Sequence, residues 1–268
     1  MLAFAANSVL CRLALGEGQI DAASYTTVRL VSAAVVLAII VLVRDRGVVR
    51  SDLNPWSALA LFGYIVFFSF AYLTLATGTG ALILFGTVQL TMFAWALKSG
   101  EAFQAMAWFG LTVAAAGLIY LLLPGVTAPD PMGALMMTVA GISWGVYSLL
   151  GRGVSDATRA TAWNFVLALP LGLATGIFFA GDIAVTTNGI VLAVVSGALT
   201  SGLGYVVWYA ALRHLATSDA ATMQLSVPVI AAAGGVLLLS EPLTMRLVVA
   251  SVATIGGIAL VLRTRASA

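Results

Sequence analysis

Charged residues are scarce in this chain of 268 residues, which has 12 Lys and Arg, 10 Asp and Glu, and one His. They make up 8% of the sequence, against about 25% in soluble globular domains, so a water-facing surface of this size is excluded. Hydrophobic residues make up 62%. A membrane helix needs about 20 mostly apolar residues, so ten crossings would use about 200 and leave only short loops.

The rarity of cysteine, histidine and lysine removes several classes of site. Cys11 is the single cysteine, which excludes an intrachain disulfide and a thiolate metal site. His214 and Lys98 are the only His and Lys, and both fall at predicted helix ends. They leave no group at depth for haem, retinal or a Ser–His protease pair. With no Walker loop either, we expect no enzyme, no cofactor and no metal site.

The remaining global features favour a membrane protein with small-molecule and lipid partners. The net charge of +2 is small and scattered, so nucleic acid is not an expected partner. Residues 1–15 lack a basic n-region and a cleavage site, which favours a first membrane helix over a signal peptide. That helix is short, which leaves open whether the N-terminus is truncated. The sequence also leaves a homodimer open.

Apolar runs separated by charged, Gly or Pro residues predict an all-α integral membrane protein. Continuous apolar stretches such as residues 30–43 do not fit the alternation of a membrane β-barrel. The ten predicted spans are 1–15, 25–43, 56–76, 79–97, 102–122, 132–150, 159–179, 189–212, 218–239 and 245–263.

The basic residues indicate the orientation, because Lys and Arg accumulate in cytoplasmic loops. Ten spans place both termini on one side. That side receives Arg44, Arg46, Arg50, Lys98, Arg152, Arg159, Arg213, Arg263 and Arg265. The other side receives Glu17, Asp21, Asp130, Asp182 and Glu241, with Arg246 as the basic residue outside the spans. The bias predicts a multi-pass protein of the cell (inner) membrane with both termini in the cytoplasm.

An internal repeat appears when the chain is shifted by 140 residues without a gap. The shift matches Leu-Ala-Thr at 75–77 with the same triplet at 215–217, and it also aligns Glu101 with Glu241 and Arg12 with Arg152. Each half, 1–123 and 132–265, would hold five helices. Because five is odd, the second half must cross the membrane in the opposite sense. Such inverted repeats are typical of secondary transporters, whose solute site lies near the bilayer midplane.

A few polar or aromatic residues fall inside the spans and are candidates for that site, because polar groups in a bilayer tend to face a cavity or another helix. The amides suit donor and acceptor groups of a solute, and the aromatic rings suit a cavity wall. Hydrogen bonding between helices and anchoring at the membrane interface are the alternatives. The candidates are Asn7, Gln89, Trp144, Tyr147, Tyr205 and Gln224.

Arg29 and Pro228 are two further features of the spans. Arg29 lies about a turn into the second span, where it is either the partner of an anion near the outer mouth or an arginine that snorkels to the interface. Pro228 lies inside the ninth span and removes a backbone hydrogen bond, so we expect a kink there. For Glu241, just before the tenth span, a carboxylate that complements that helix dipole is the favoured interpretation.

The segment Tyr209-Ala-Ala-Leu-Arg-His-Leu-Ala-Thr, the proline at 228 and the segment Leu237-Leu-Leu-Ser-Glu-Pro-Leu resemble the second repeat of EamA-type proteins in the drug/metabolite transporter superfamily. The first repeat departs from the pattern at Val88 and Ala102. The resemblance implies a ten-helix carrier for amino acids, metabolites or toxic compounds. It also implies a central cavity that includes Asn7, Trp144, Tyr147, Tyr205 and Gln224.

Together these features predict a secondary transporter of a small organic solute that works by alternating access, with export as the expected direction. The alternative is a non-transporting membrane sensor or assembly protein with the same fold. No Asp or Glu falls in the middle of a span, so the usual proton-carrying carboxylate is missing and the coupling stays open.

Overall fold

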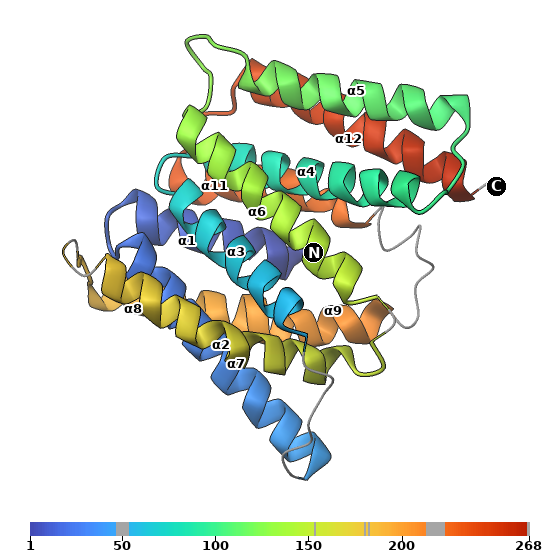
Figure 1. Ribbon diagram of the computed structural model, residues 1–268. Coiled ribbons are helices and arrows are strands. Elements are labelled where there is room, and N and C mark those ends of the chain that lie inside the picture. Colours follow the sequence, from blue (N-terminus) through green and yellow to red (C-terminus); the bar gives the residue numbers. More distant parts are fainter. Residues whose placement is uncertain (47–53, 153, 180, 182, 213–222, 267–268) are drawn as a thin grey trace.

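The computed structural model describes residues 1–46, 54–152, 154–179, 181, 183–212 and 223–266, and these residues form a helical bundle (Figure 1). The described chain contains one isolated β-bridge, between Ile20 and Val185, and no longer strand. The helices are α1 (Leu2–Gly16), α2 (Ala22–Asp45), α3 (Pro55–Ala71), α4 (Thr77–Lys98), α5 (Ala105–Leu122), α6 (Pro131–Leu150), α7 (Ala157–Phe178), α8 (Thr187–Val195), the π-helix η2 (Ser196–Leu203), α9 (Gly204–Leu212), α11 (Ser226–Leu239) and α12 (Met245–Ala266).

Seven helical segments are long and apolar enough to cross a bilayer: α2, α4, α5, α6, α7, the continuous run from α8 to Trp208, and α12. Shorter apolar helices, α1, α3 and α11, complete the set. Large apolar side chains point outward along the bundle; Ile39 is 55% exposed and Leu238 is 72% exposed. Such an exterior suits lipid rather than water, and the multi-pass membrane class expected from the sequence is confirmed.

Three predicted spans differ in detail. The third ends at Ala71, five residues early, because the chain turns at Tyr72–Leu75 before α4 begins. The eighth is one continuous run that changes from α-helix to π-helix at Ser196. The ninth is described only from residue 223, and its helix is interrupted at Leu225. Pro228 is therefore the third residue of α11 rather than a residue of a helix interior.

Side-chain caps explain where several helices begin. A polar oxygen at the N-cap accepts a hydrogen bond from an otherwise unpaired backbone N–H of the first turn. Such caps start α2, α3, α6, α7 and α8, and the residues are Asp21, Asn54, Asp130, Asp156 and Thr186. Two of these helices, α3 and α6, also have proline at the first position, where a missing N–H costs nothing.

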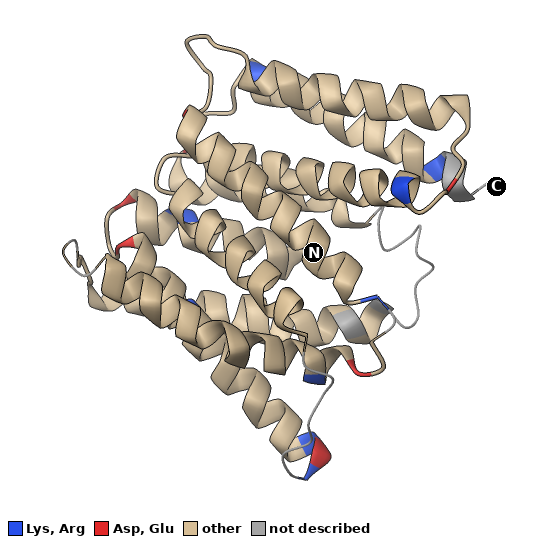
Figure 2. Cartoon of the chain, viewed as in Figure 1, with Lys and Arg blue, Asp and Glu red and all other residues tan. Residues whose placement is uncertain are grey.

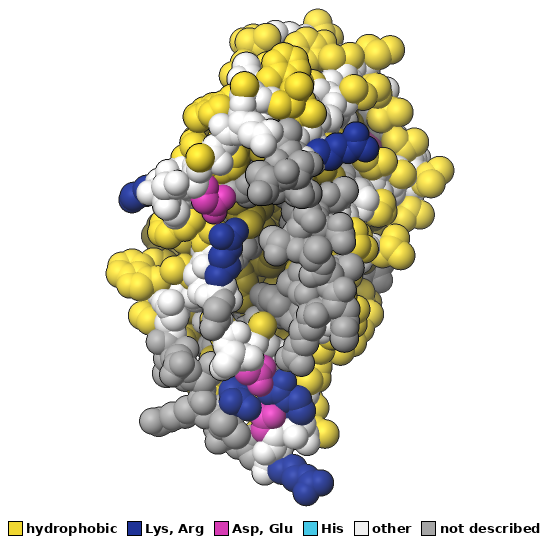
Figure 3. Space-filling view, turned by 90° about the vertical axis from the view of Figure 1, so that its right-hand side faces the viewer, with side chains coloured by type: hydrophobic (Ala, Val, Ile, Leu, Met, Phe, Trp, Pro, Cys, Tyr) yellow, Lys and Arg dark blue, Asp and Glu magenta, His cyan; other side chains and the backbone are white. Residues whose placement is uncertain are grey.

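The charged residues gather at the two ends of the bundle, with long uncharged stretches between them (Figure 2). One end, which we call the Arg44 end, has an ion cluster in which Arg44 and Arg159 contact both Asp45 and Asp156. Viewed onto this end, charged side chains form several separate groups on the face, and hydrophobic side chains cover its top and its right-hand edge (Figure 3). The opposite, Glu241 end carries Glu17, Asp21, Asp130 and Glu241. Arg50, Asp182 and Arg213 lie outside the described residues.

Candidate functional site

A polar cluster lies inside the bundle where α1, α2, α3 and η2 meet. Asn7 of α1 donates from Nδ2 to the hydroxyl of Tyr64, 3.3 Å away. Its Oδ1 accepts from Ser196 at 2.7 Å and from Thr200 at 3.2 Å. Four hydrogen-bonding groups from three helices thus converge at a site with hardly any exposure, Asn7 itself being 4% exposed.

Arg29 joins this cluster from α2. Its Nε donates to Ser201 Oγ at 3.2 Å and its Nη2 to Tyr64 Oη at 3.3 Å. The guanidinium also lies over the rings of Tyr64 and Phe68, with its carbon 5.4 Å and 5.0 Å from the two ring centroids. Because Arg29 is 0% exposed, the snorkelling interpretation is wrong: the side chain points into the bundle and not toward the interface.

The π-helix explains how these hydroxyls are brought to one side. In a π-helix the backbone bonds close over five residues instead of four, which widens the turn and often marks a functional site. Ser196, Thr200 and Ser201 all face α1 and α2. Gly197 lets η2 approach closely, since a Cβ at this position would lie 3.0 Å from the carbonyl carbon of Arg29 and overlap its oxygen.

A small pocket lies beside Tyr64 and Phe68, which form part of its lining. Its walls are mostly aromatic, and its volume in this conformation is ≈ 10 Å³. Trp144 contacts Tyr64 and Tyr205, with ring centroids 4.8 Å and 5.3 Å apart. We call this the central pocket, and its lining consists of Phe4, Tyr64, Phe68, Leu84, Phe85, Trp144 and Gln224.

The remaining predicted site residues, Tyr205, Tyr147 and Gln89, do not line this pocket. Tyr205 is 3% exposed and packs against Phe4 and Trp144 without lining the pocket. Tyr147 bonds Thr161 at 3.2 Å and lines a second, more polar pocket of ≈ 130 Å³ toward the Arg44 end, together with Asn54 and Asn164. Gln89 is half-buried on α4 and lines neither pocket.

At the Glu241 end, α1, α4 and the end of α11 meet in a three-way contact. Glu241 accepts from the backbone N–H of Thr77 at 2.8 Å and from Arg12 Nε at 3.3 Å. Arg12 also donates to the carbonyls of Tyr72 and Leu73 at 3.0 and 3.1 Å. The carboxylate therefore caps α4, and the expectation that it serves the dipole of the following helix is wrong.

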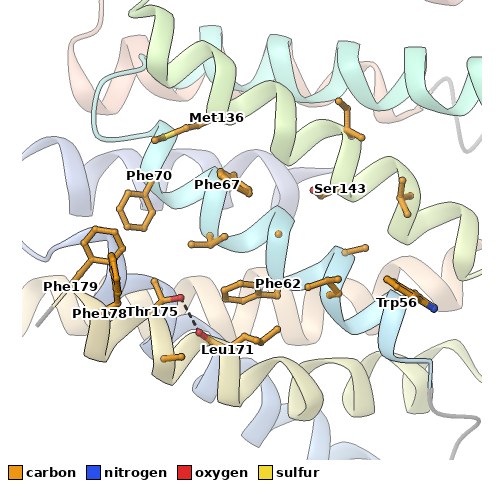
Figure 4. A pocket seen from close by; sticks show the side chains of 17 residues that line it. Trp56, Phe62, Phe67, Phe70, Met136, Ser143, Leu171, Thr175, Phe178 and Phe179 are labelled. Carbon is orange, nitrogen blue, oxygen red and sulfur yellow. Dashed lines mark hydrogen bonds between the residues drawn. The ribbon is translucent and has the colours of Figure 1, made fainter.

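A large cavity opens on the outside of the bundle between α3, α6 and α7 (Figure 4). It has a volume of ≈ 860 Å³ and walls of rings and aliphatic chains such as Phe62, Phe70 and Phe178. The polar side chains Ser143 and Thr175 are the exceptions, and Thr175 bonds its own helix at Leu171. This groove suits an apolar chain such as a lipid tail, and it lacks the polar groups that fix a polar solute.

Sequence reasoning missed most of the polar partners in the cluster. Tyr64 and Phe68 look like ordinary residues of an apolar helix, and Ser201 is one of many small hydroxyls in the chain. One available signal was the concentration of Ser196, Thr200 and Ser201 within six residues of one span.

Comparison with known proteins gives a consistent picture. Residues 131–263 match the profile of the EamA-like transporter family. An uncharacterized protein of Pseudomonas aeruginosa is 48% identical over 235 residues, which cover 88% of this chain and 82% of that protein. An uncharacterized transporter of Archaeoglobus fulgidus is 29% identical over 203 residues, 70% of this chain and 69% of that protein. A protein of known crystal structure shares the fold, with a TM-score of 0.70 over 98% of this chain and 97% of its own, at 20% identity.

Proposed function

Since the chain belongs to the EamA-like transporter family, we propose that it is a secondary carrier of a small organic solute that works by alternating access between two inverted repeats. The family places it among membrane transporters of the drug/metabolite superfamily. The finer claims rest on the arrangement of helices, on the residues around the central pocket and on the difference between the two ends.

The packing of the helices supports the inverted repeat. A half-chain shift relates α1 to α6, α2 to α7, α3 to η2 and α9, α4 to α11, and α5 to α12. When each helix is replaced by its counterpart, the contacts are preserved. The contact between α3 and α6 corresponds to that between η2 and α1, and the contact between α4 and α6 corresponds to that between α11 and α1. Three pairs, α2 with α7, α4 with α11 and α5 with α12, contact their own counterparts. In Figure 1, α5 and α12 run in opposite directions.

The single observation that carries the proposal is the composition of the central pocket. Two pairs of its residues are related by the shift of 140: Phe4 with Trp144, and Leu84 with Gln224. A pocket lined by such pairs lies where the two halves meet. This is the position that a solute site takes in carriers with inverted repeats.

The two ends differ as alternating access requires. At the Glu241 end, Arg12 and Glu241 form an ion pair. Their counterparts under the shift, Arg152 and Glu101, lie toward the Arg44 end. Arg152 is exposed and forms no ion pair with any residue that the structure describes. We take the described conformation as closed at the Glu241 end, where Arg12 and Glu241 form their ion pair.

The charges support an orientation with the Arg44 end in the cytoplasm. Six described basic residues lie at or near this end, Arg44, Arg46, Lys98, Arg152, Arg159 and Arg263, against Arg12 and Arg246 at the other. The positive-inside bias therefore favours cytoplasmic termini, and a solute taken up from that side would be exported.

Flux through purified protein in liposomes tests the proposal. A panel of amino acids, organic acids and cationic drugs should include a solute with saturable flux, and Trp144→Ala or Gln224→Ala should reduce it by removing pocket walls. Trp56→Ala is the matched control, because Trp56 is 69% exposed on the outer groove. Flux that survives both pocket substitutions would refute the site, and no flux for any solute would refute carriage.

The alternative, a membrane sensor or assembly protein, is favoured by the small volume of the central pocket. It predicts that a solute binds without net flux. The same liposomes distinguish the two, because only a carrier releases its solute on the opposite side.

A further inference from the structure

We propose that Arg29 is the charge partner of the solute, and that the solute is a monocarboxylate with an apolar or aromatic body. This inference rests on the proposed carrier function and adds the substrate class. It begins with the charges: the guanidinium is fully buried, and no carboxylate lies within 4.0 Å of it among the residues that the structure describes.

Such a charge is costly to bury without a counter-charge. Arginine stays protonated in proteins, so neutralisation by proton loss, which relieves other buried cations, is not available. The hydroxyls of Tyr64 and Ser201 and the faces of two rings stabilise the cation, but they carry no full negative charge. A buried cation in a membrane protein marks a functional site by default.

The hydrogen bonding around Arg29 is also incomplete. Among the residues that the structure describes, neither its Nη1 nor Thr26 Oγ1 has a hydrogen-bond partner. Thr26 lies three positions before Arg29 on α2, hence on the same face of the helix. Buried polar atoms are nearly always paired in native proteins, so two unpaired atoms on one face, one of them a guanidinium N–H, indicate a place for a polar ligand.

The guanidinium fork and its single charge select the chemistry. A planar guanidinium binds a carboxylate through two parallel hydrogen bonds. One positive charge at depth balances one negative charge, whereas a phosphate monoester would leave a second charge uncompensated. No carboxylate lies mid-span to pair with a solute ammonium, which favours an acid without an amino group.

The surroundings select the rest of the molecule. Tyr64 and Phe68 contact the Arg29 guanidinium and also line the central pocket, whereas Arg29 itself does not line it. The other walls include Phe4, Phe85 and Trp144, which suit an apolar or aromatic body. A solute in the pocket would reach the guanidinium by displacing the rings of Tyr64 and Phe68, and their movement would couple binding to α3.

Binding measured by thermal stabilisation tests the inference without transport, since a ligand raises the melting temperature of the state it binds. The probes are 3-phenylpropionate, its neutral amide, phenyl phosphate and phenylalanine, each added to purified protein in detergent. We expect stabilisation by 3-phenylpropionate above that of the other three. We expect Arg29→Gln to weaken that binding at least tenfold and Arg246→Gln, an arginine at the bundle end, to leave it unchanged.

The outcomes separate the hypotheses. Equal stabilisation by acid and amide, or an undiminished response in Arg29→Gln, would overturn the role of Arg29; a preference for phenyl phosphate or phenylalanine would overturn the substrate class. If Arg29→Gln does not fold, Arg29→Lys decides, because it should keep the preference for the acid over the amide with weaker binding. If another solute is transported but the acid does not bind, the carrier function is supported and this inference is refuted. If the acid binds but no solute is transported, this inference is supported and the carrier function is refuted.

Discussion

Loss of the Arg12–Glu241 contact should open the Glu241 end of the bundle. The carboxylate holds two elements together, the backbone N–H of Thr77 at 2.8 Å and Arg12 at 3.3 Å. The Arg12 and Glu241 side chains are 25% and 13% exposed, so solvent screens the pair only in part. Hydrogen bonds to charged groups contribute about 1.5–3 kcal/mol, and with screening we take about 1–2 kcal/mol for the closed end.

That energy gives the expected size of the effect. If the contact exists only when the end is closed, its loss raises the ratio of open to closed molecules by about 5–30-fold. Glu241→Ala removes both interactions, whereas Glu241→Gln keeps an acceptor for Thr77 and should have the smaller effect. The control is Asp130→Asn at the same end, because Asp130 bonds Thr74 and caps α6 without contacting Arg12.

A cysteine reporter measures the opening. Cys11 is buried and is the single cysteine, so Cys11→Ala gives a background without thiols. In this background, Ser8→Cys introduces one thiol a helical turn deeper than Arg12, at a position where the native side chain is 1% exposed. An impermeant methanethiosulfonate added to intact cells should modify this thiol faster when Glu241 is replaced. The same rate in Glu241→Ala as in the parent chain would refute the reasoning.

Two further substitutions test other parts of the structure. Gly197→Ala should separate η2 from α2 by about 1 Å and lower the stability by about 1–3 kcal/mol through overpacking, because the added Cβ would overlap Arg29 and Ser32. The control is Gly256→Ala, whose Cβ would meet no atom within 4 Å, so the melting temperature should stay unchanged or rise. Equal effects of the two substitutions would contradict the close approach of η2 to α2. At the Arg44 end, burial raises the pKa of Asp156 but hydrogen bonds from Arg44 and from the backbone N–H of Arg159 outweigh it and leave the pKa below its ordinary value. The resulting stability is present above the unfolded pKa of about 4 and lost as pH falls through the lower folded pKa. Asp156→Asn should therefore lower the melting temperature at pH 7, and its effect should shrink progressively as the pH falls below about 4. An effect that does not change with pH would count against this reasoning.

The extent of the spans could be predicted because lipid demands apolar residues over a fixed length, and nine of the ten predicted spans contain a described helix that starts within three residues of the predicted position. The rotation of each helix about its own axis could not be predicted from the sequence. Ser69 and Thr138 bond their own helices at Ile65 and Ala134, whereas Ser201 reaches Arg29 on another helix, and nothing in the local sequence tells these hydroxyls apart.

The candidate site could be predicted only in part, because the packing between helices decides which polar side chains meet. Trp144 and Gln224 line the central pocket, as large or polar groups deep in a span should. The burial of Arg29 depends on the distance between α2 and η2, which Gly197 sets from a position 168 residues away. A snorkelling arginine and a buried one share the same local sequence, so only the packed structure decides between them.

Within the part of the chain that the structure describes, the polar cluster has no counterpart in the other proposed repeat. Under the shift of 140, Arg29 corresponds to Leu169, Tyr64 to Gly204 and Ser201 to Leu61. In the proposed carrier, whose halves exchange roles, the solute would therefore meet a different environment in each of the two states. The charge would stay with one half of the molecule, so the two states would differ in their affinity for an anion, and this difference would favour one side of the membrane.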